Sequence, residues 1–215
     1  MLKFLKHSLF DFKTTGAVMA SSKKLAELMI ATANIEKART IVELGPGTGV
    51  FTERILKQIS RKAIFFALEI NPSFLHETKK RCPSATIYLD SAINIRYYLR
   101  KHGVDGCDCI ISGLPWAIFD RAEQEILIQT IEDALNPGGK FLTFAYIQTL
   151  LLPSGRRFRK IISKKFDETE TTKIVFQNFP PAFVHICHKS VSAEKLSGHL
   201  EKPRYASPPS YLVTP

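Results

Sequence analysis

The sequence contains no apolar run that approaches the ~20 residues a helix needs to cross a bilayer. Its first apolar stretch is interrupted by Lys3, Lys6 and His7, so we expect no signal peptide. Cysteine is scarce, and the 4 cysteines are Cys82, Cys107, Cys109 and Cys187. Cys107 and Cys109 stand in an apolar strand pattern and cannot direct both thiolates at one metal together with a distant pair. We therefore expect no metal site, and inert free thiols in a reducing cytosol.

Acidic residues are also in the minority, with 20 Asp and Glu against 30 Lys and Arg. The formal net charge is +10 and the sequence pI is near 9.5. A basic surface attracts polyanions, but charge alone does not choose between nucleic acid and an anionic membrane face. The 45% hydrophobic fraction is enough for a core, and 215 residues predict one domain with short appendages.

Strand and helix patterns alternate over residues 40–189, which predicts an α/β fold with a parallel sheet and right-handed crossovers. The expected strands are 40–44, 63–69, 85–89, 107–112, 139–147, roughly 171–177, and 182–188. Only residues 178–181 separate the last two, so we expect an antiparallel hairpin at the sheet edge. A helix capped by Ser21 or Ser22 precedes the first strand. The tail over 190–215 is polar, proline-rich and aperiodic, which predicts disorder.

Residues 41–49, Ile-Val-Glu-Leu-Gly-Pro-Gly-Thr-Gly, carry the clearest motif. A β-branched strand runs into a glycine-rich turn that opens a helix, and such glycines let a ligand approach bare backbone. A dinucleotide-binding fingerprint would need its last glycine at Val50. The pattern E-x-G-x-G-x-G instead resembles motif I of the class I S-adenosyl-L-methionine (SAM) methyltransferases, although an ordinary βα turn is the alternative. The resemblance implies that this turn holds the methionine part of SAM, and its candidate contacts are Glu43, Gly45, Gly47, Thr48 and Gly49.

Acidic residues end or follow the next two expected strands. Glu69 can accept both ribose hydroxyls of an adenosine, or it is simply a helix N-terminal charge, because Asn71-Pro72 opens the next helix. By the resemblance, Asp90 accepts a hydrogen bond from the adenine amino group near the Ala92 backbone, or it merely caps the following helix. Further candidate cofactor contacts at these strand ends are Ile70, Ser91, Ala92 and Ser112. Because the carboxyl ends of parallel strands meet at one edge, the motifs together predict SAM as the cofactor.

The fourth expected strand leads into Gly113-Leu114-Pro115-Trp116. In the ribosomal-RNA adenine dimethyltransferases this loop carries Asn-Leu-Pro-Tyr or a close relative. The asparagine there accepts a hydrogen bond from the base amine, and the aromatic ring stacks on the flipped base. Gly113 stands at the asparagine position and has no side chain with which to read a base. The form Ser-Gly-Leu-Pro instead resembles the bacterial phospholipid N-methyltransferases, which make phosphatidylcholine from phosphatidylethanolamine.

This second resemblance covers most of residues 3–189. Its similar segments are Gly-Ala-Val-Met-Ala-Ser-Ser at 16–22, motif I at 43–49, Phe-Ala-Tyr at 144–146, and Asn-Phe-Pro-Pro-Ala at 178–182. Ala20 and Ala145 depart from the family's proline and threonine, which leaves the preferred aminolipid open. The resemblance implies a Rossmann-like class I methyltransferase domain over residues 14–189. That fold has a seven-stranded sheet, mostly parallel with an antiparallel last strand, and added N-terminal helices.

Methyl transfer from SAM to an amine needs few catalytic side chains. A lone pair on nitrogen displaces the thioether from the methyl carbon, so the enzyme must hold the two in near-attack geometry. The substrate ammonium, with a reference pKa of ~10, must first lose its proton, and desolvation favours the neutral form. We therefore expect no catalytic triad. Trp116 and Tyr146 are candidates to contact the amine through cation–π interactions. The alternative for both residues is core packing, and Tyr146 could instead bind the lipid phosphate. Gly113, Leu114 and Pro115 are the candidate substrate contacts.

Two basic segments bear on the partner. Residues 1–13 place Leu2, Leu5, Leu9 and Phe12 on one helical face with lysines beside it, which suits an anionic membrane interface or packing on the domain. The resemblance implies membrane binding. A second cluster, from Arg156 to Lys165, suits lipid phosphates or RNA. The sequence thus predicts a cytoplasmic enzyme, peripheral on the inner membrane face, that methylates phosphatidylethanolamine and its methylated derivatives. The alternatives are a ribosomal-RNA-type adenine N6-methyltransferase and a SAM-binding membrane module without catalysis.

Overall fold

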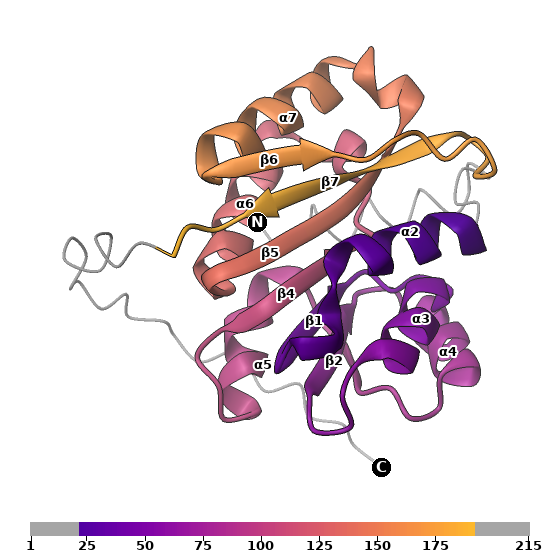
Figure 1. The fold of residues 1–215 in the computed structure, drawn as a ribbon, viewed down its shortest axis with the longest axis vertical. Helices are drawn as coiled ribbons and strands as arrows, with labels where there is room; N and C mark the ends of the chain where they lie inside the picture. The colour runs from indigo at the N-terminus through magenta and orange to yellow at the C-terminus, as the bar shows by residue number, and fades with distance from the viewer. Residues whose placement is uncertain (1–21, 192–215) are drawn as a thin grey trace.

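The computed structural model describes residues 22–191, which form one seven-stranded sheet with helices on both faces (Figure 1). The strands are β1 (Thr40–Leu44), β2 (Ile64–Glu69), β3 (Ile87–Leu89), β4 (Cys107–Ser112), β5 (Leu135–Tyr146), β6 (Glu168–Thr171) and β7 (Ala182–His188). Their order across the sheet is β3-β2-β1-β4-β5-β7-β6. Strands β1 to β5 are parallel, β7 is antiparallel to β5, and β6 is antiparallel to β7. The predicted fold class is confirmed.

Six helices and four short 3-10 turns connect the strands of the described chain. The helices are α2 (Lys23–Ala33), α3 (Val50–Gln58), α4 (Pro72–Arg81), α5 (Ile95–Lys101), α6 (Arg121–Ala134) and α7 (Pro153–Lys165). The 3-10 turns are η1 (Ile35–Lys37), η2 (Ala92–Asn94), η3 (Trp116–Ile118) and η4 (Ile147–Leu150). Two hydrophobic clusters fill the molecule, with α2, α3 and α4 on one face of the sheet and α5, α6 and α7 on the other.

Local sequence signals set the helix starts. Ser22 caps α2, because its side chain accepts a hydrogen bond from the backbone N–H of Leu25 at 3.1 Å. Asn71 caps α4 in the same way, and Pro72 at the first helical position supplies the backbone angle that the helix needs. Both starts were predicted. The predicted amphipathic segment 1–13, and the predicted tail beyond Val191, lie outside the described residues.

The strands expected at 63–69 and 85–89 begin at Ile64 and Ile87, and two other predicted strands differ more from their observed bounds. The strand expected over 139–147 is Leu135–Tyr146, and its pairing with β4 shifts register between Cys107, which pairs with Leu135, and Cys109, which pairs with Lys140. The strand expected over roughly 171–177 is instead Glu168–Thr171. Within the misplaced range, Val175 forms an isolated bridge with Ala182. The antiparallel hairpin at the sheet edge is present, with residues 172–181 as its connection.

Candidate active site

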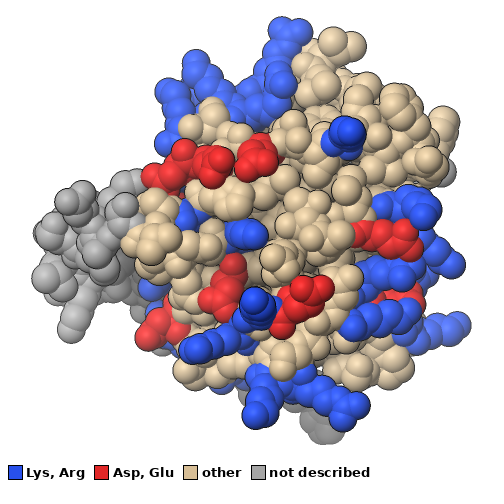
Figure 2. Space-filling view, in the orientation of Figure 1, with Lys and Arg blue, Asp and Glu red and all other residues tan. Residues whose placement is uncertain are grey.

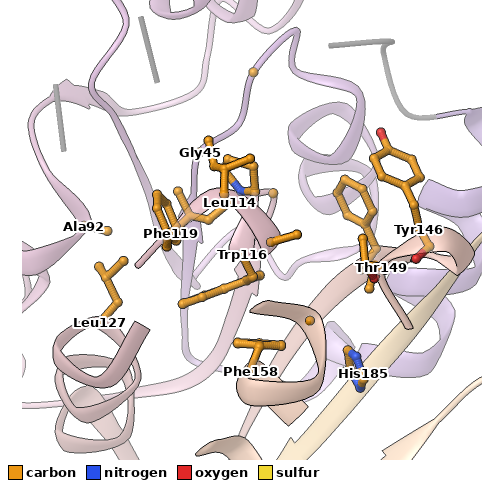
Figure 3. Close-up of a pocket in the computed structure, with 18 of the residues that line it drawn as sticks. Gly45, Ala92, Leu114, Trp116, Phe119, Leu127, Tyr146, Thr149, Phe158 and His185 are labelled. Carbon is orange, nitrogen blue, oxygen red and sulfur yellow. Dashed lines mark hydrogen bonds between the residues drawn. The ribbon is translucent and has the colours of Figure 1, made fainter. Parts of the chain in front are cut away.

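A cavity of about 450 Å³ lies where β1, β2 and β4 end, and it extends under η4 and α7 (Figure 3). The structure places eleven of the predicted site residues on its wall: Gly45, Gly47, Glu69, Ile70, Ser91, Ala92, Gly113, Leu114, Pro115, Trp116 and Tyr146. The predicted residues that do not line it are Glu43, Thr48, Gly49, Asp90 and Ser112. The strand ends therefore meet around one space, as their positions in the sequence predicted.

The glycine turn exposes its backbone to this cavity. Gly45, Gly47 and Gly49 have φ values of 69°, 58° and 78°, in the left-handed region that glycine adopts without strain. A Cβ atom at Gly47 would meet nothing within 4 Å, so the Cα of Gly47 faces open space. Gly49 has a packing role, because a Cβ atom at this position would lie only 3.0 Å from the side chain of Thr78 in α4. The turn thus leaves bare backbone where a ligand can approach, and it closes against α4 behind.

Glu69 joins the glycine turn to the start of α4. Its Oε2 accepts a hydrogen bond from the Gly47 N–H at 3.2 Å, and its Oε1 accepts one from the Asn71 N–H at 2.9 Å. The residue is 6% exposed, and burial raises the pKa of the carboxyl, while the backbone hydrogen bonds lower it. The carboxylate accepts three backbone hydrogen bonds, from Gly47, Ile70 and Asn71, and still has lone-pair capacity for a ribose hydroxyl.

Glu43 is buried beneath the same turn. Thr52 donates a hydrogen bond to its Oε2 at 2.7 Å, and its Oε1 has no partner among residues 22–191. Burial, reinforced by the nearby Glu69 charge, raises the pKa of Glu43 to about 8. A buried carboxylate oxygen without a partner is costly, and a bound cation would satisfy it. Glu43 does not line the cavity itself, so its contact with the ammonium of the SAM methionine stays a prediction, while the unpartnered oxygen and the open glycine turn beside it fit that cofactor.

Asp90 follows β3, and its carboxylate already has protein partners. Asn94 donates a hydrogen bond to Oδ1 at 2.8 Å, and the Tyr98 hydroxyl donates one to Oδ2 at 3.0 Å. Ser91, rather than Asp90, caps the η2 turn. Ser91 and Ala92 line the cavity, so the structure offers an adenine ring these two residues directly. The contact between Asp90 and adenine stays a prediction.

Gly113 packs directly against the glycine turn. Its N–H donates a hydrogen bond to the Leu44 carbonyl at 2.8 Å. A Cβ atom added to Gly113 would collide with the carbonyl oxygen of Gly45, at less than the 3.0 Å that real Cβ atoms keep. No side chain fits here unless one of the two loops moves. The loop after β4, which the sequence predicts to hold the methyl acceptor, is therefore built around a glycine at this position.

Trp116 is both a wall of the cavity and part of the core. Its indole N–H donates a hydrogen bond to the Thr143 hydroxyl at 2.9 Å, and that hydroxyl donates to the Ser112 carbonyl at 3.1 Å. One indole face stacks on Phe158 of α7, with ring centroids 4.7 Å apart. Core packing and contact with a ligand are thus compatible for this residue.

Tyr146 lies on the opposite side of the cavity from Trp116 (Figure 3). The side chain is half-buried, and its ring meets Phe144 edge-on at 5.5 Å. Burial raises the pKa of its phenol. Its hydroxyl makes no hydrogen bond within the described part of the chain, so it is available to a ligand.

The sequence did not single out the far half of the cavity. Its walls there include Phe119, Leu127, Leu150, Leu152, Phe158 and His185. The apolar members look like ordinary core residues, and His185 stands within an apolar strand. Arg159 is the exception, because it belongs to the predicted basic cluster and also lines this half. The cavity therefore joins a polar corner at the glycine turn to a mainly apolar chamber.

Known proteins resemble this chain in sequence and in fold. Residues 15–97 match the family described as ribosomal RNA adenine dimethylase. An ornithine lipid N-methyltransferase of Singulisphaera acidiphila is 27% identical over 190 residues, which cover 86% of this chain and 92% of that protein. An O-methyltransferase of Streptomyces achromogenes in complex with SAM superposes with a TM-score of 0.66 at 14% identity, covering 86% of this chain and 89% of that one. A Bacillus cereus O-methyltransferase in complex with S-adenosyl-L-homocysteine gives a TM-score of 0.64 at 12% identity, with coverages of 86% and 90%.

Proposed function

We propose that this chain, a SAM-dependent methyltransferase with the class I fold, methylates the amine of a phospholipid at an anionic membrane surface. The substrate would be phosphatidylethanolamine or one of its methylated derivatives. Successive methylation of this amine would give phosphatidylcholine. SAM supplies a methyl group on a sulfonium, an electrophile that needs only a well-placed neutral amine.

The apolar character of the acceptor half of the cavity carries this proposal. Beyond Gly113 the wall is made largely of side chains such as Leu114, Phe119, Leu127, Leu152 and Phe158. A nucleobase would leave its donors and acceptors unpaired against such a surface, at a cost of about 1–3 kcal/mol for each group. The acyl chains of a lipid have no hydrogen-bonding groups to leave unpaired, so they can contact this apolar surface without that cost. The same walls exclude water and so favour the neutral amine over the ammonium.

The surface around the cavity mouth is also suited to a bilayer. Leu151, Phe176 and Phe179 are 75%, 71% and 74% exposed, and their neighbours Leu152 and Pro180 line the cavity. Large exposed apolar side chains of this kind mark protein or membrane contacts. Lys and Arg gather over α7, which begins at Pro153 directly after Leu152 (Figure 2). Apolar residues flanked by cations match the interface of an anionic membrane.

The chain enters the described fold at this mouth. The backbone N–H of Ser22 donates a hydrogen bond to the side-chain oxygen of Asn178 at 2.8 Å, and Asn178 is buried next to Phe179 and Pro180. The residues between 13 and 22 could extend at most about 30 Å. A membrane-bound segment 1–13 would therefore stay close to the cavity mouth. None of the described helices is long and apolar enough to cross a membrane.

The comparisons support a lipid acceptor more directly than an RNA acceptor. The similarity to the ornithine lipid N-methyltransferase extends over 86% of this chain. The match to the adenine dimethylase family ends at residue 97, before the acceptor loop begins at Gly113. That match therefore covers the part of the chain that would hold the cofactor. It keeps an adenine N6-methyltransferase as the second candidate.

Expression in a bacterium that lacks phosphatidylcholine tests the proposal. Mass spectrometry of the lipid extract should show mono-, di- or trimethylated phosphatidylethanolamine. A Glu69→Ala variant expressed at the same level should yield much less of these methylated lipids. Methylated ornithine lipid in place of methylated phosphatidylethanolamine would keep the reaction and change the substrate. An unchanged lipid profile, together with label from SAM in RNA, would overturn the proposal.

A further inference from the structure

His185 occupies the wall between two spaces in the molecule. It lies on β7, paired with Thr143 of β5 on one side and Thr171 of β6 on the other. Its side chain lines the apolar chamber beyond Phe158 (Figure 3). It also lines an adjoining open groove of about 370 Å³, which α7 and β6 form with Arg159, Lys160 and Glu170 among its residues. His185 is thus the contact between the substrate chamber and an outer polar groove.

The imidazole of His185 is held by packing and not by hydrogen bonds. Its ring meets Phe158 edge-on at 5.8 Å and Phe183 at 5.0 Å, and the residue is only 3% exposed. Neither ring nitrogen forms a hydrogen bond with another residue of the described chain. A core histidine ordinarily has a partner for its N–H. Here the partners that could satisfy the ring lie in the two spaces it faces.

The surroundings keep this imidazole neutral. Burial, helped by the charge of Arg159, lowers the pKa of His185 to about 4. Near neutral pH the ring is therefore neutral and has one nitrogen with a free lone pair, and it must become more basic before it can hold a proton taken from an ammonium. The groups that face it from α7 are Arg156, Arg159 and Lys160, and Glu170 faces the groove from β6. Of these charged groups, Arg159 is the one that adds to burial in disfavouring the imidazolium.

We propose that His185 is the base that removes the proton from the substrate ammonium and passes it to solvent through the groove. The inference rests on the proposed lipid amine, because an ammonium must lose a proton before it can attack. An N–H bond of the ammonium breaks, its electron pair stays on the substrate nitrogen, and the proton bonds to the imidazole. The nitrogen lone pair then forms the N–CH₃ bond while the methyl–sulfur bond breaks and its pair remains on sulfur. The imidazolium finally gives its proton to water in the groove.

The position of Arg159 couples this base to the substrate. Arg159 lines both spaces, is exposed, and has no ion pair with another described residue. Burial is the larger cause of the low pKa of His185, and the charge of Arg159 is the smaller one. An anionic headgroup, such as a phosphate, that pairs with Arg159 would offset this second cause. The imidazole would then become more basic only when substrate is bound.

A His185→Asn variant tests the role, with His188→Asn as the matched control. His188 lies three residues along the same strand, and it lines neither space. We expect His185→Asn to lower the rate of methyl transfer to phosphatidylethanolamine vesicles by about 10²–10⁴-fold, the usual contribution of a general base. The dissociation constant for SAM, measured calorimetrically, should stay within about twofold in both variants, because neither residue lies at the glycine turn. The control should keep its full rate.

A second variant separates base chemistry from packing. His185→Ala opens a space for free imidazole, which should restore part of the rate in proportion to its concentration if the role is that of a base. Histidine NMR supplies a readout without turnover. The signal missing from His185→Asn should be that of a neutral imidazole at pH 6, and phosphoethanolamine should raise its titration midpoint.

The outcomes distinguish this inference from the proposed function. If the unmodified protein methylates lipid, and either His185→Asn keeps full activity or imidazole fails to rescue a His185→Ala protein that still binds SAM, the role of His185 alone is refuted. If the unmodified protein methylates no lipid amine, the proposed function is wrong and the base has no substrate.

Discussion

The carbonyl oxygen of Gly45 occupies the space that a side chain at Gly113 would need. Gly45 directly follows β1 and Gly113 directly follows β4, and these two strands pair side by side. The glycine turn and the predicted acceptor loop therefore form one packed unit. The absence of an asparagine at position 113 is therefore a property of the fold as well as of the sequence. Under the proposed function, a lipid amine at this site meets aromatic and aliphatic walls instead of an amide side chain that reads a base.

The first prediction concerns Gly113→Asn. This change would place the adenine-type residue in the loop, but its Cβ would displace the Gly45 peptide. We expect SAM affinity to fall at least about tenfold and the free energy of unfolding to drop by about 1–3 kcal/mol, as for other overpacked sites. Calorimetric SAM titration and chemical denaturation measure both, with Ala117→Ser in the next turn as the control. A variant that binds SAM normally and methylates adenine would contradict the account.

The second prediction concerns Glu69→Ala. The change removes the proposed ribose acceptor and also leaves the N–H groups of Gly47 and Asn71 without their partner. Hydrogen bonds to a charged group contribute about 1.5–3 kcal/mol, so the SAM dissociation constant should rise by about 10- to 100-fold. Glu53→Ala, on the exposed side of α3, should leave it unchanged. Equal affinity in Glu69→Ala would remove the residue from the site.

The third prediction is a pH dependence of SAM binding. The pKa of Glu43 is raised to about 8, so in the free protein this carboxyl is protonated at pH 7. A cation beside its unpartnered oxygen favours the ionised form, so binding should expel a proton, and affinity should rise with pH until it levels near 8. Calorimetry in two buffers of different ionisation enthalpy counts that proton. Binding of SAM to Glu43→Gln should release no such proton. Titration of the SAM amino group contributes equally in both proteins, so the difference in proton count reports Glu43. The same proton count in the variant would contradict the role.

The fourth prediction concerns the exposed apolar residues at the cavity mouth. Burial of an aromatic side chain contributes about 1.5–3 kcal/mol, so Phe179→Ser should weaken binding to anionic vesicles by roughly tenfold or more. SAM affinity should not change. Tyr97→Ser removes a 50% exposed aromatic residue from α5 and serves as the control. Vesicle co-sedimentation measures the effect. Equal losses in both variants would mean that the mouth is not the docking surface.

Strands with a continuous apolar pattern could be predicted from the sequence, and others could not. Residues 40–44, 107–112 and 182–188 were placed at their observed bounds, because their apolar side chains are buried in the sheet. Strand β6 has the sequence Glu-Thr-Glu-Thr, and all four residues are exposed. No periodic signal marks it, and pairing with β7 decides its position. The apolar residues around Val175 have a clearer strand pattern, so the sequence predicts the strand there.

The candidate site divides in a similar way. Its polar corner could be found because glycines and acidic residues at strand ends form a local motif that the turn geometry requires. The apolar chamber could not, because Phe158 and Leu127 look the same as core residues until the fold shows which of them face a cavity. His185 is the clearest case. Only the sheet pairing and the packing of α7 show that it faces two spaces.

The most direct test of a lipid acceptor is a competition between substrates. The purified protein would be given methyl-labelled SAM, vesicles of phosphatidylethanolamine with an anionic lipid, and ribosomal RNA that carries unmethylated adenines, all in one reaction. The account predicts that label appears in the organic extract as methylated phosphatidylethanolamine and that RNA stays unlabelled. Label in the RNA, with none in the lipid, would contradict it.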